Sequence, residues 1–311
     1  MFLLDRRVFF AVLTFVLLAS WALTELVINL RTLLICSITV VYLLGAERYL
    51  IKRKSLRTAK VMFSFSIVLL AGWIAAIIHF SAMSLKTPEI DATLYAWDRA
   101  LGLDWIALFN WLEERPVLDR ILGIAYASLL PQIIAVIIML SKPGRESDLD
   151  EFLKLYVATL LFSSVIGALF PAHAMCRWSG MEAAATQEIM SRAACAFLPV
   201  YDGLRNGTLT EIDIAHLDGL VTFPSFHTTA AILLAWAFRR IPMAAPFFIA
   251  LNLLMIGGTP TFGGHYFVDI IAGGLIAFVA IAASRMLSQQ DRSFFNQAAA
   301  SIAFHKGKLP H

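Results

Sequence analysis

Charged residues are scarce in this chain: Asp, Glu, Lys and Arg make up 15% of its 311 residues. A typical soluble domain carries about 25% charged residues. Because 59% of the residues are hydrophobic, we expect lipid to form part of the protein's surroundings. The formal net charge of +3 is too small to indicate a nucleic-acid partner, so we expect none.

Cysteine is also rare, with three residues in the chain. They form no Cys-x-x-Cys pair and no Cys/His spacing typical of a metal site, and we expect no cofactor. Cys36 lies in an apolar run and is expected to be inert. Cys176 and Cys195 fall in one long loop, where a disulfide and two free thiols are both compatible with the sequence.

Eight apolar runs, bounded by charge, proline or glycine, are candidate membrane-spanning helices. A helix needs about 20 apolar residues to cross the hydrocarbon layer, or somewhat fewer where it enters at the interface, and the sixth and seventh runs are short. We therefore predict an all-α, multi-pass transmembrane helical bundle of about eight spans. The runs cover residues 8–29, 32–47, 61–83, 118–141, 152–171, 225–238, 243–258 and 266–284.

The distribution of basic residues predicts an orientation. With a cytoplasmic N-terminus, 17 of the 25 Lys and Arg residues fall in cytoplasmic segments, as the positive-inside rule requires. We expect both termini in the cytoplasm and place the protein in the plasma (inner) membrane. Residues 1–22 could instead be a cleaved signal peptide, but apolar character resumes through residues 27–30, and we expect a retained helix.

Two long segments lie on the predicted non-cytoplasmic side. In residues 84–117, apolar and aromatic residues recur at helical spacing, which predicts a helix lying in the membrane interface. Residues 172–223 form a polar loop that leads into the sixth span. We divide the chain into an N-terminal two-helix extension (1–60), a six-helix core (61–287) and a cytoplasmic tail (288–311).

Two of the seven histidines stand out by their context. His227 ends the sequence Pro224-Ser225-Phe226-His227, directly ahead of an apolar run. Proline is favoured in the first turn of a helix, so Ser225 and His227 are expected at a helix N-terminus. Free N–H groups and the positive end of the helix dipole favour phosphate binding there, and the Ser225 hydroxyl adds a donor.

His265 opens the eighth span and precedes Asp269 by four residues. Residues four apart share one face of a helix, so Asp269 can accept a hydrogen bond from one imidazole nitrogen and leave the other free to attack. An aspartate inside a span costs about 3 kcal/mol, and His265 is its expected partner. Gly263 and Gly264 are expected to let a phosphate group approach the backbone.

The order of the spans puts both helix starts on the same side, so His227 and His265 can face each other. The alternative is that His227 only caps a helix and that His265 and Asp269 form a structural polar pair. Of the other histidines, His79 is interpreted as a satisfied interface residue and His173 as a weak candidate for lining a site. The remaining three, in solvated segments, are His216, His305 and His311.

At these residues the chain resembles the type 2 phosphatidic acid phosphatase superfamily. Pro224-Ser225-Phe226-His227 is similar to its Pro-Ser-Gly-His motif, with Phe226 in place of glycine. The run that begins at His265 is more similar still to the inositol phosphorylceramide synthase-like branch. The resemblance covers spans three to eight as a six-helix core.

The resemblance implies a two-step mechanism without a metal. His265 would form a phosphohistidine, Asp269 would steady the imidazolium, and His227 would protonate the leaving oxygen. The superfamily's first motif, Lys-x6-Arg-Pro, is absent between residues 84 and 223, and Thr259 replaces a motif arginine. The cation that binds the phosphate is therefore sought in the loop that precedes the sixth span. Arg205, nearest to the Pro-Ser-x-His element, is preferred there over Arg177 and Arg192.

Three functions are compatible with the sequence. A lipid phosphate phosphatase would use water as acceptor, and a phosphotransferase would use a lipid or polyol hydroxyl. The third is a non-catalytic membrane transporter or scaffold. It is disfavoured because the predicted spans are nearly free of charge, whereas transporters usually carry ionisable groups near the midplane. We expect an enzyme acting on a lipid phosphate, with its active site on the non-cytoplasmic side.

Overall fold

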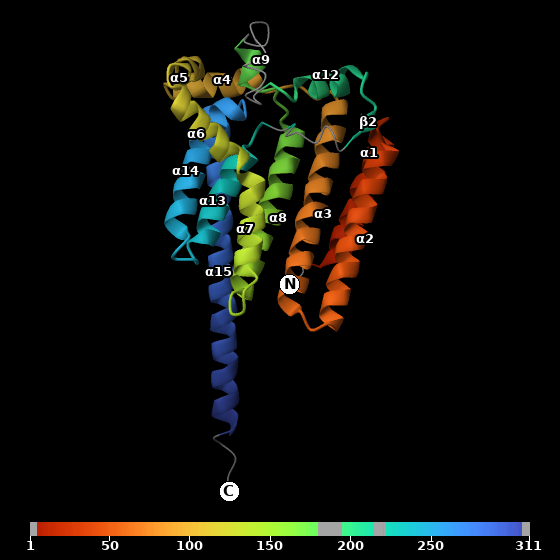
Figure 1. Cartoon of the computed structure of the whole chain (residues 1–311), viewed down its shortest axis with the longest axis vertical. Coiled ribbons are helices and arrows are strands. Elements are labelled where there is room, and N and C mark those ends of the chain that lie inside the picture. Colours follow the sequence, from red (N-terminus) through yellow and green to blue (C-terminus); the bar gives the residue numbers. More distant parts are fainter. Residues whose placement is uncertain (1–4, 180–194, 214–219, 221, 307–311) are drawn as a thin grey trace.

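The computed structural model describes residues 5–179, 195–213, 220 and 222–306. Within this part the chain is almost entirely helical, with 13 helices and one pair of two-residue strands. The longer helices run side by side as a bundle, and shorter helices lie across one of its ends (Figure 1). The prediction of an all-α membrane bundle is confirmed.

Each of the eight predicted spans corresponds to a helix or a helix pair of the bundle. Among the described helices, six are long and apolar enough to cross a membrane, and the pair α6–α7, bent by 50°, is a candidate seventh. Pro131 explains the bend, because it has no N–H to donate to the carbonyl of Ala127. The bundle consists of α1 (Arg6–Leu23), α2 (Leu30–Lys52), α3 (Leu56–Ser84), α6 (Pro116–Ala127), α7 (Leu129–Leu140), α8 (Glu146–Leu169), α13 (Phe226–Phe238), α14 (Ala245–Phe262) and α15 (Phe267–Lys306).

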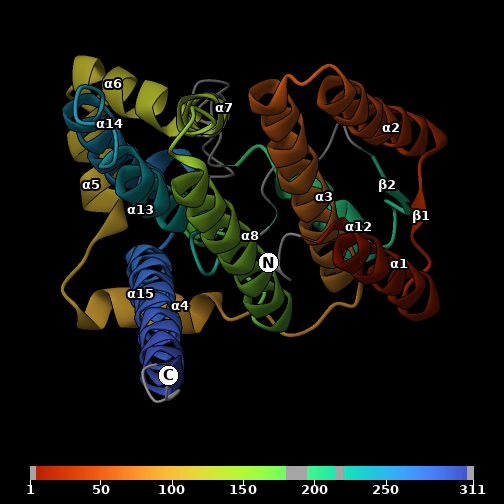
Figure 2. The ribbon, with the colours of Figure 1, turned by 90° about the horizontal axis from the view of Figure 1, so that it is seen from below.

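The eighth candidate, α13, is apolar but has 13 residues. At 1.5 Å per residue it is about 20 Å long, shorter than the hydrocarbon layer of about 30 Å. It packs between α8, α14 and α15 in the middle of the bundle (Figure 2). The main hydrophobic core surrounds it, with buried side chains that include Ile67, Val136, Leu153, Leu233 and Phe238.

Basic residues from different predicted cytoplasmic segments meet at one end of the bundle. Lys60 in α3 pairs with Asp150 in α8 at 2.5 Å. Arg145, at the start of α8, donates to the backbone carbonyl of Arg240, in the turn between α13 and α14. The chain therefore alternates between the two ends of the bundle in the order that the sequence predicts.

Four short helices form a cap layer over the opposite end: α4 (Asp91–Ala100), α5 (Trp105–Glu113), α9 (Met175–Trp178) and α12 (Leu198–Asn206). The single interface helix predicted within residues 84–117 is instead two helices, because the chain turns between them at Gly102, whose φ is +73°. Strands β1 (Val27–Ile28) and β2 (Glu211–Ile212) pair in parallel beside this layer. Cys176 and Cys195 form a disulfide there.

Candidate active site

The start of α13 is capped by its own sequence. Ser225 is the N-cap residue, and its hydroxyl oxygen accepts a hydrogen bond from the N–H of Thr228 at 3.4 Å, which satisfies a free donor of the first turn. His227 is the second residue of the helix. The helix therefore starts where predicted, but Pro224 precedes the cap and does not lie in the first turn.

His265 and Asp269 form the predicted pair for a different reason. His265 lies two residues before Phe267, the first residue of α15, so the two do not share a helix face. Asp269 Oδ2 accepts the backbone N–H of Tyr266 at 3.0 Å and lies 3.2 Å from His265 Nδ1. The carboxylate thus reaches back over the residues that precede its helix.

The starts of α13 and α15 cross in close contact. The N–H of Ser225 donates to the backbone carbonyl of Asp269 at 3.0 Å, and the hydroxyl of Thr229 donates to the carbonyl of Gly273 at 2.8 Å. A Cβ atom at Gly273 would lie 2.2 Å from the carbonyl oxygen of Ser225, so only glycine permits this approach. The crossing brings the two histidine-bearing segments together.

His227 and His265 line one cavity of about 240 Å³, walled by α3, α8 and the starts of α13 and α15. His79 from α3 and Ser163 from α8 line it as well, and most of the remaining wall is apolar. Among the described residues that line the cavity there is no Asp, Glu, Lys or Arg. The two histidines predicted to act together therefore face the same space.

Tyr126 in α6 packs against the ring of His227. Their rings stack with centroids 4.2 Å apart, and the phenolic oxygen lies 3.4 Å from His227 Nδ1. Gly263 lies close to Tyr126 and to the His265 ring. A Cβ atom there would be 2.9 Å from the Tyr126 oxygen and 2.5 Å from His265 Cδ2. The structure therefore gives Gly263 a packing role, which the sequence does not indicate.

Two aspartates of α4 hold the start of α15 from the cap layer. Asp98 accepts hydrogen bonds from the backbone N–H groups of Phe267 and Val268, both at 2.9 Å. Asp91 accepts one from the hydroxyl of Tyr266 at 2.8 Å. Both aspartates are 2% exposed, and burial raises the pKa of each carboxyl, while its hydrogen-bond donors act in the opposite direction.

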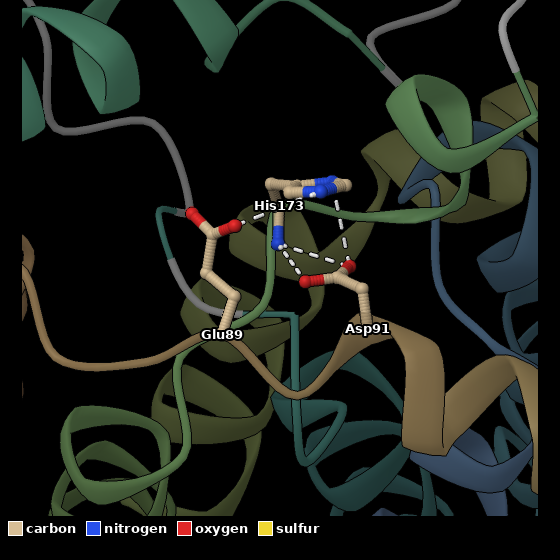
Figure 3. Close-up of side chains that lie close together, drawn as sticks. All are labelled: Glu89, Asp91 and His173. Atoms are coloured by element: carbon tan, nitrogen blue, oxygen red, sulfur yellow. Dashed lines mark hydrogen bonds and ion pairs between the residues drawn. The ribbon is translucent and has the colours of Figure 1, made fainter.

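Asp91 also belongs to a cluster with Glu89 and His173 (Figure 3). The backbone N–H of His173 donates to both Asp91 oxygens at 3.1 Å. Ligand atoms of the three residues lie within 4.8 Å of one another, so they could hold a metal ion, which the sequence does not predict. Glu89 already accepts from Arg205 at 3.0 Å and from the Tyr201 hydroxyl at 2.8 Å. With these donors in place, the cluster forms a hydrogen-bonded network.

The structure does not bring the predicted phosphate-binding arginines to the cavity wall. Arg205 donates to the carbonyl of Thr87 at 3.0 Å, and its buried Nη1 has no hydrogen-bond partner among the described residues. Arg177 forms an ion pair with Asp202. Neither arginine lines the cavity, and Arg192 lies outside the described residues.

Four other residues considered in the sequence also differ from expectation or cannot be placed. The interpretation of His79 as a satisfied residue is wrong, because its buried Nε2 has no hydrogen-bond partner among the described residues. His173 does not line the cavity, and neither does Ser225, whose hydroxyl caps α13. His216 lies outside the described residues. A lone histidine in an apolar run has no sequence signal that marks it as part of a site, which explains the error at His79.

Comparison with protein families gives one match. The family model described as the PAP2 superfamily matches residues 92–283, from α4 to α15. The match begins after α3, so it covers spans four to eight and not the third span. A comparison with curated proteins and one with solved structures return no match.

Proposed function

Because this chain belongs to the PAP2 superfamily, whose model matches more than half of it, we propose that it is a membrane enzyme that removes or transfers a phosphate group on a lipid. Members of this superfamily are generally phosphatases or phosphotransferases. The observation that carries the proposal is that His227 and His265 line one cavity, with Asp269 bound to the far side of the His265 ring.

His265 is the proposed nucleophile. Its Nδ1 faces Asp269, so Nε2 attacks phosphorus; the N–P bond forms and the bond from phosphorus to the leaving oxygen breaks. The electron pair stays on that oxygen, which takes a proton from His227. Asp269 stabilises the positive charge that develops on the His265 ring.

An acceptor hydroxyl completes the reaction. Its oxygen attacks phosphorus, the N–P bond breaks, and the electron pair returns to Nε2 of His265. The hydroxyl proton passes to His227, which restores the starting state. Water as acceptor releases phosphate, whereas an alcohol gives a new phosphate ester. The similarity of the run that begins at His265 to the inositol phosphorylceramide synthase-like branch favours an alcohol.

The negative charge of the phosphate is expected to lie near the start of α13. Free N–H groups of the first turn and the positive end of the helix dipole are available next to His227. Arg205 remains the preferred guanidinium contact, ahead of Arg177, because its Nη1 has no hydrogen-bond partner within the described part of the chain. Since Arg205 does not line the cavity, its side chain would have to turn away from Glu89 and Thr87 to reach the phosphate.

We place the active site on the non-cytoplasmic side of the membrane, with both termini in the cytoplasm. The contacts made by Lys60 and Arg145 in the basic segments lie at the other end of the bundle, and basic residues favour the cytoplasmic side. The Cys176–Cys195 bond in the cap layer supports this orientation, because disulfides persist in oxidising compartments.

The test is a His265→Ala variant, assayed as detergent-purified protein with dioctanoyl phosphatidate as substrate in EDTA. Loss of the nucleophile should lower phosphate release at least about 10³-fold. Wild-type protein incubated with radiolabelled substrate should carry an acid-labile label that His265→Ala lacks. His305→Ala, in the predicted tail, is the matched histidine control and should keep wild-type activity.

Three results would contradict the proposal. Wild-type turnover that requires a divalent metal would exclude the mechanism above. Unaltered phosphate release in His265→Ala would exclude His265 as the nucleophile, and the absence of turnover in the wild-type protein would favour a transporter or scaffold.

A further inference from the structure

We propose that His79 and Ser163 form a second polar subsite in the cavity, which binds the hydroxyl group that accepts the phosphate. The inference rests on the proposed function and assigns it two positioning residues outside the catalytic pair. His79 lies on α3 and Ser163 on α8, whereas the catalytic histidines come from the starts of α13 and α15.

Both side chains present a polar atom that has no partner. His79 Nε2 and Ser163 Oγ are buried and have no hydrogen-bond partner in the part of the chain that the structure describes. Both residues line the cavity, and Ser163 is 2% exposed. Buried polar atoms in folded proteins nearly always have a partner, so two such atoms in one cavity wall indicate a polar ligand.

The two residues lie at a similar depth in the bundle. His79 is five residues before Ser84, the end of α3, and Ser163 is six residues before Leu169, the end of α8. At 1.5 Å per residue these offsets are about 7.5 and 9 Å, α3 packs directly against α8, and both residues line the same cavity. We therefore assign them to one subsite.

The chemistry of the subsite fits a neutral hydroxyl. Nε2 of an imidazole can donate or accept a hydrogen bond, and a serine hydroxyl can do both. Among the described residues of the cavity wall there is no Asp, Glu, Lys or Arg, which disfavours a second anion or a cation at this position. A hydroxyl needs one donor and one acceptor, and this pair supplies both.

The cavity also has room for an alkyl chain attached to that hydroxyl. Most of its wall is apolar and includes Phe80, Leu129 and Leu160. An amphipathic alcohol can therefore keep its chain among apolar residues while its hydroxyl reaches His79 and Ser163.

In the transfer step the subsite positions the attacking oxygen and takes no part in the bond changes. The alcohol oxygen forms the new O–P bond, and the N–P electron pair returns to His265. The hydroxyl proton passes to His227. His79 and Ser163 hold the oxygen through hydrogen bonds, so their loss should weaken alcohol binding without changing the affinity for the phosphate donor.

Ser163→Ala and Ser164→Ala form a matched pair for the test. Both serines line the cavity, but the Ser164 hydroxyl already donates to the carbonyl of Leu160 at 2.7 Å. With dioctanoyl phosphatidate as donor and 1-octanol as acceptor, Ser163→Ala should raise the octanol concentration for half-maximal transfer about tenfold. Ser164→Ala should leave it within about twofold.

His79 gives a second pair of variants. His79→Phe should weaken octanol binding about tenfold, and His79→Gln, which keeps a polar group near the position of Nε2, should restore part of it. Ethylene glycol, which has no alkyl chain, should be a poorer acceptor than 1-octanol in the wild-type protein. Photolabelling with a diazirine-bearing octanol, without donor, should mark α3 and α8 and weaken in Ser163→Ala.

The outcomes separate the two proposals. Wild-type protein that is labelled by the octanol but neither releases nor transfers phosphate contradicts the proposed function alone. Equal transfer and equal labelling in Ser163→Ala and Ser164→Ala overturn the subsite. Equal losses of hydrolysis and transfer in His79→Phe, with a higher KM for phosphatidate, also overturn it, because they assign His79 to the phosphate.

Discussion

The starts of α13 and α15 carry the two candidate catalytic histidines, and they are built in different ways. α13 is capped by Ser225, the residue directly before it. At α15, the N–H groups of Phe267 and Val268 donate to Asp98 of α4, which lies 169 and 170 residues earlier. The helix start that carries His227 is therefore capped by local sequence, whereas the helix start that follows His265 is capped by a distant helix of the cap layer.

This difference predicts which substitutions disturb the segment around each histidine. A displacement of α4 acts on the segment around His265 while the cap of α13 stays intact. Only a change at the crossing itself, where Gly273 meets the backbone of Ser225, is expected to disturb both helix starts. Three experiments, given in order of decreasing expected effect, test this difference between the two helix starts.

Gly273→Ala should have the largest effect. A Cβ atom at this position would lie 2.2 Å from the Ser225 carbonyl oxygen, so the helices must separate, at about 3 kcal/mol of unfolding free energy. Both the rate of phosphate release and the midpoint of thermal unfolding in detergent should be lower in this variant than in the wild-type protein. Gly274→Ala is the control, because its Cβ would meet only Ile232 Cδ1 at 3.7 Å, and it should be neutral or slightly stabilising. Equal effects of the two substitutions would show that the crossing is not closely packed.

Asp98→Ala should have the next largest effect and should exceed that of Ser225→Ala. It removes the acceptor of two N–H groups, and the expected loss is about 2 kcal/mol, whereas loss of the Ser225 cap should cost about 1 kcal/mol. Thermal unfolding of both variants in one detergent measures the difference. A larger loss in Ser225→Ala would contradict the view that the start of α15 depends on a remote cap.

The pH dependence of stability should give the smallest effect. Burial raises the pKa of Asp98 in the folded protein, so the folded state holds this proton more tightly than the unfolded chain, where the pKa is about 3.9. The contribution of Asp98 is therefore complete below that value and declines as pH rises through the folded pKa. The unfolding midpoint of wild type, measured relative to that of non-titrating Asp98→Asn, should fall as pH rises from about 4. A rise would mean that the carboxylate is held ionised.

The parts of the fold and site that depend on neighbouring residues could be predicted from the sequence. Apolar runs identified the bundle helices, and the Pro-Ser-x-His sequence located the start of α13 at Ser225. His265 and Asp269 are in contact as predicted, although the carboxylate reaches back over the preceding residues. The catalytic roles assigned to these residues remain predictions.

The parts that depend on distant contacts could not be predicted. Asp98 and Asp91 occupy an amphipathic segment that resembles a simple interface helix, and their partners become apparent only when α4 packs against α15. His79 was misinterpreted for a related reason: its surroundings come from α8 and the helix starts, not from its own run. The periodicity of apolar residues in a sequence identifies which face of a helix is buried, but not which other helix packs against that face.

The length of α13 has a consequence for how a substrate reaches the histidines. With its basic turn at one membrane surface, a helix of about 20 Å in a hydrocarbon layer of about 30 Å ends roughly 10 Å short of the opposite surface. The proposed reaction centre would then be sunken, and a phosphorylated headgroup would have to descend from the water boundary to meet His227. In that drier setting each fixed dipole and proton donor acts on the phosphate more strongly than it would in bulk water.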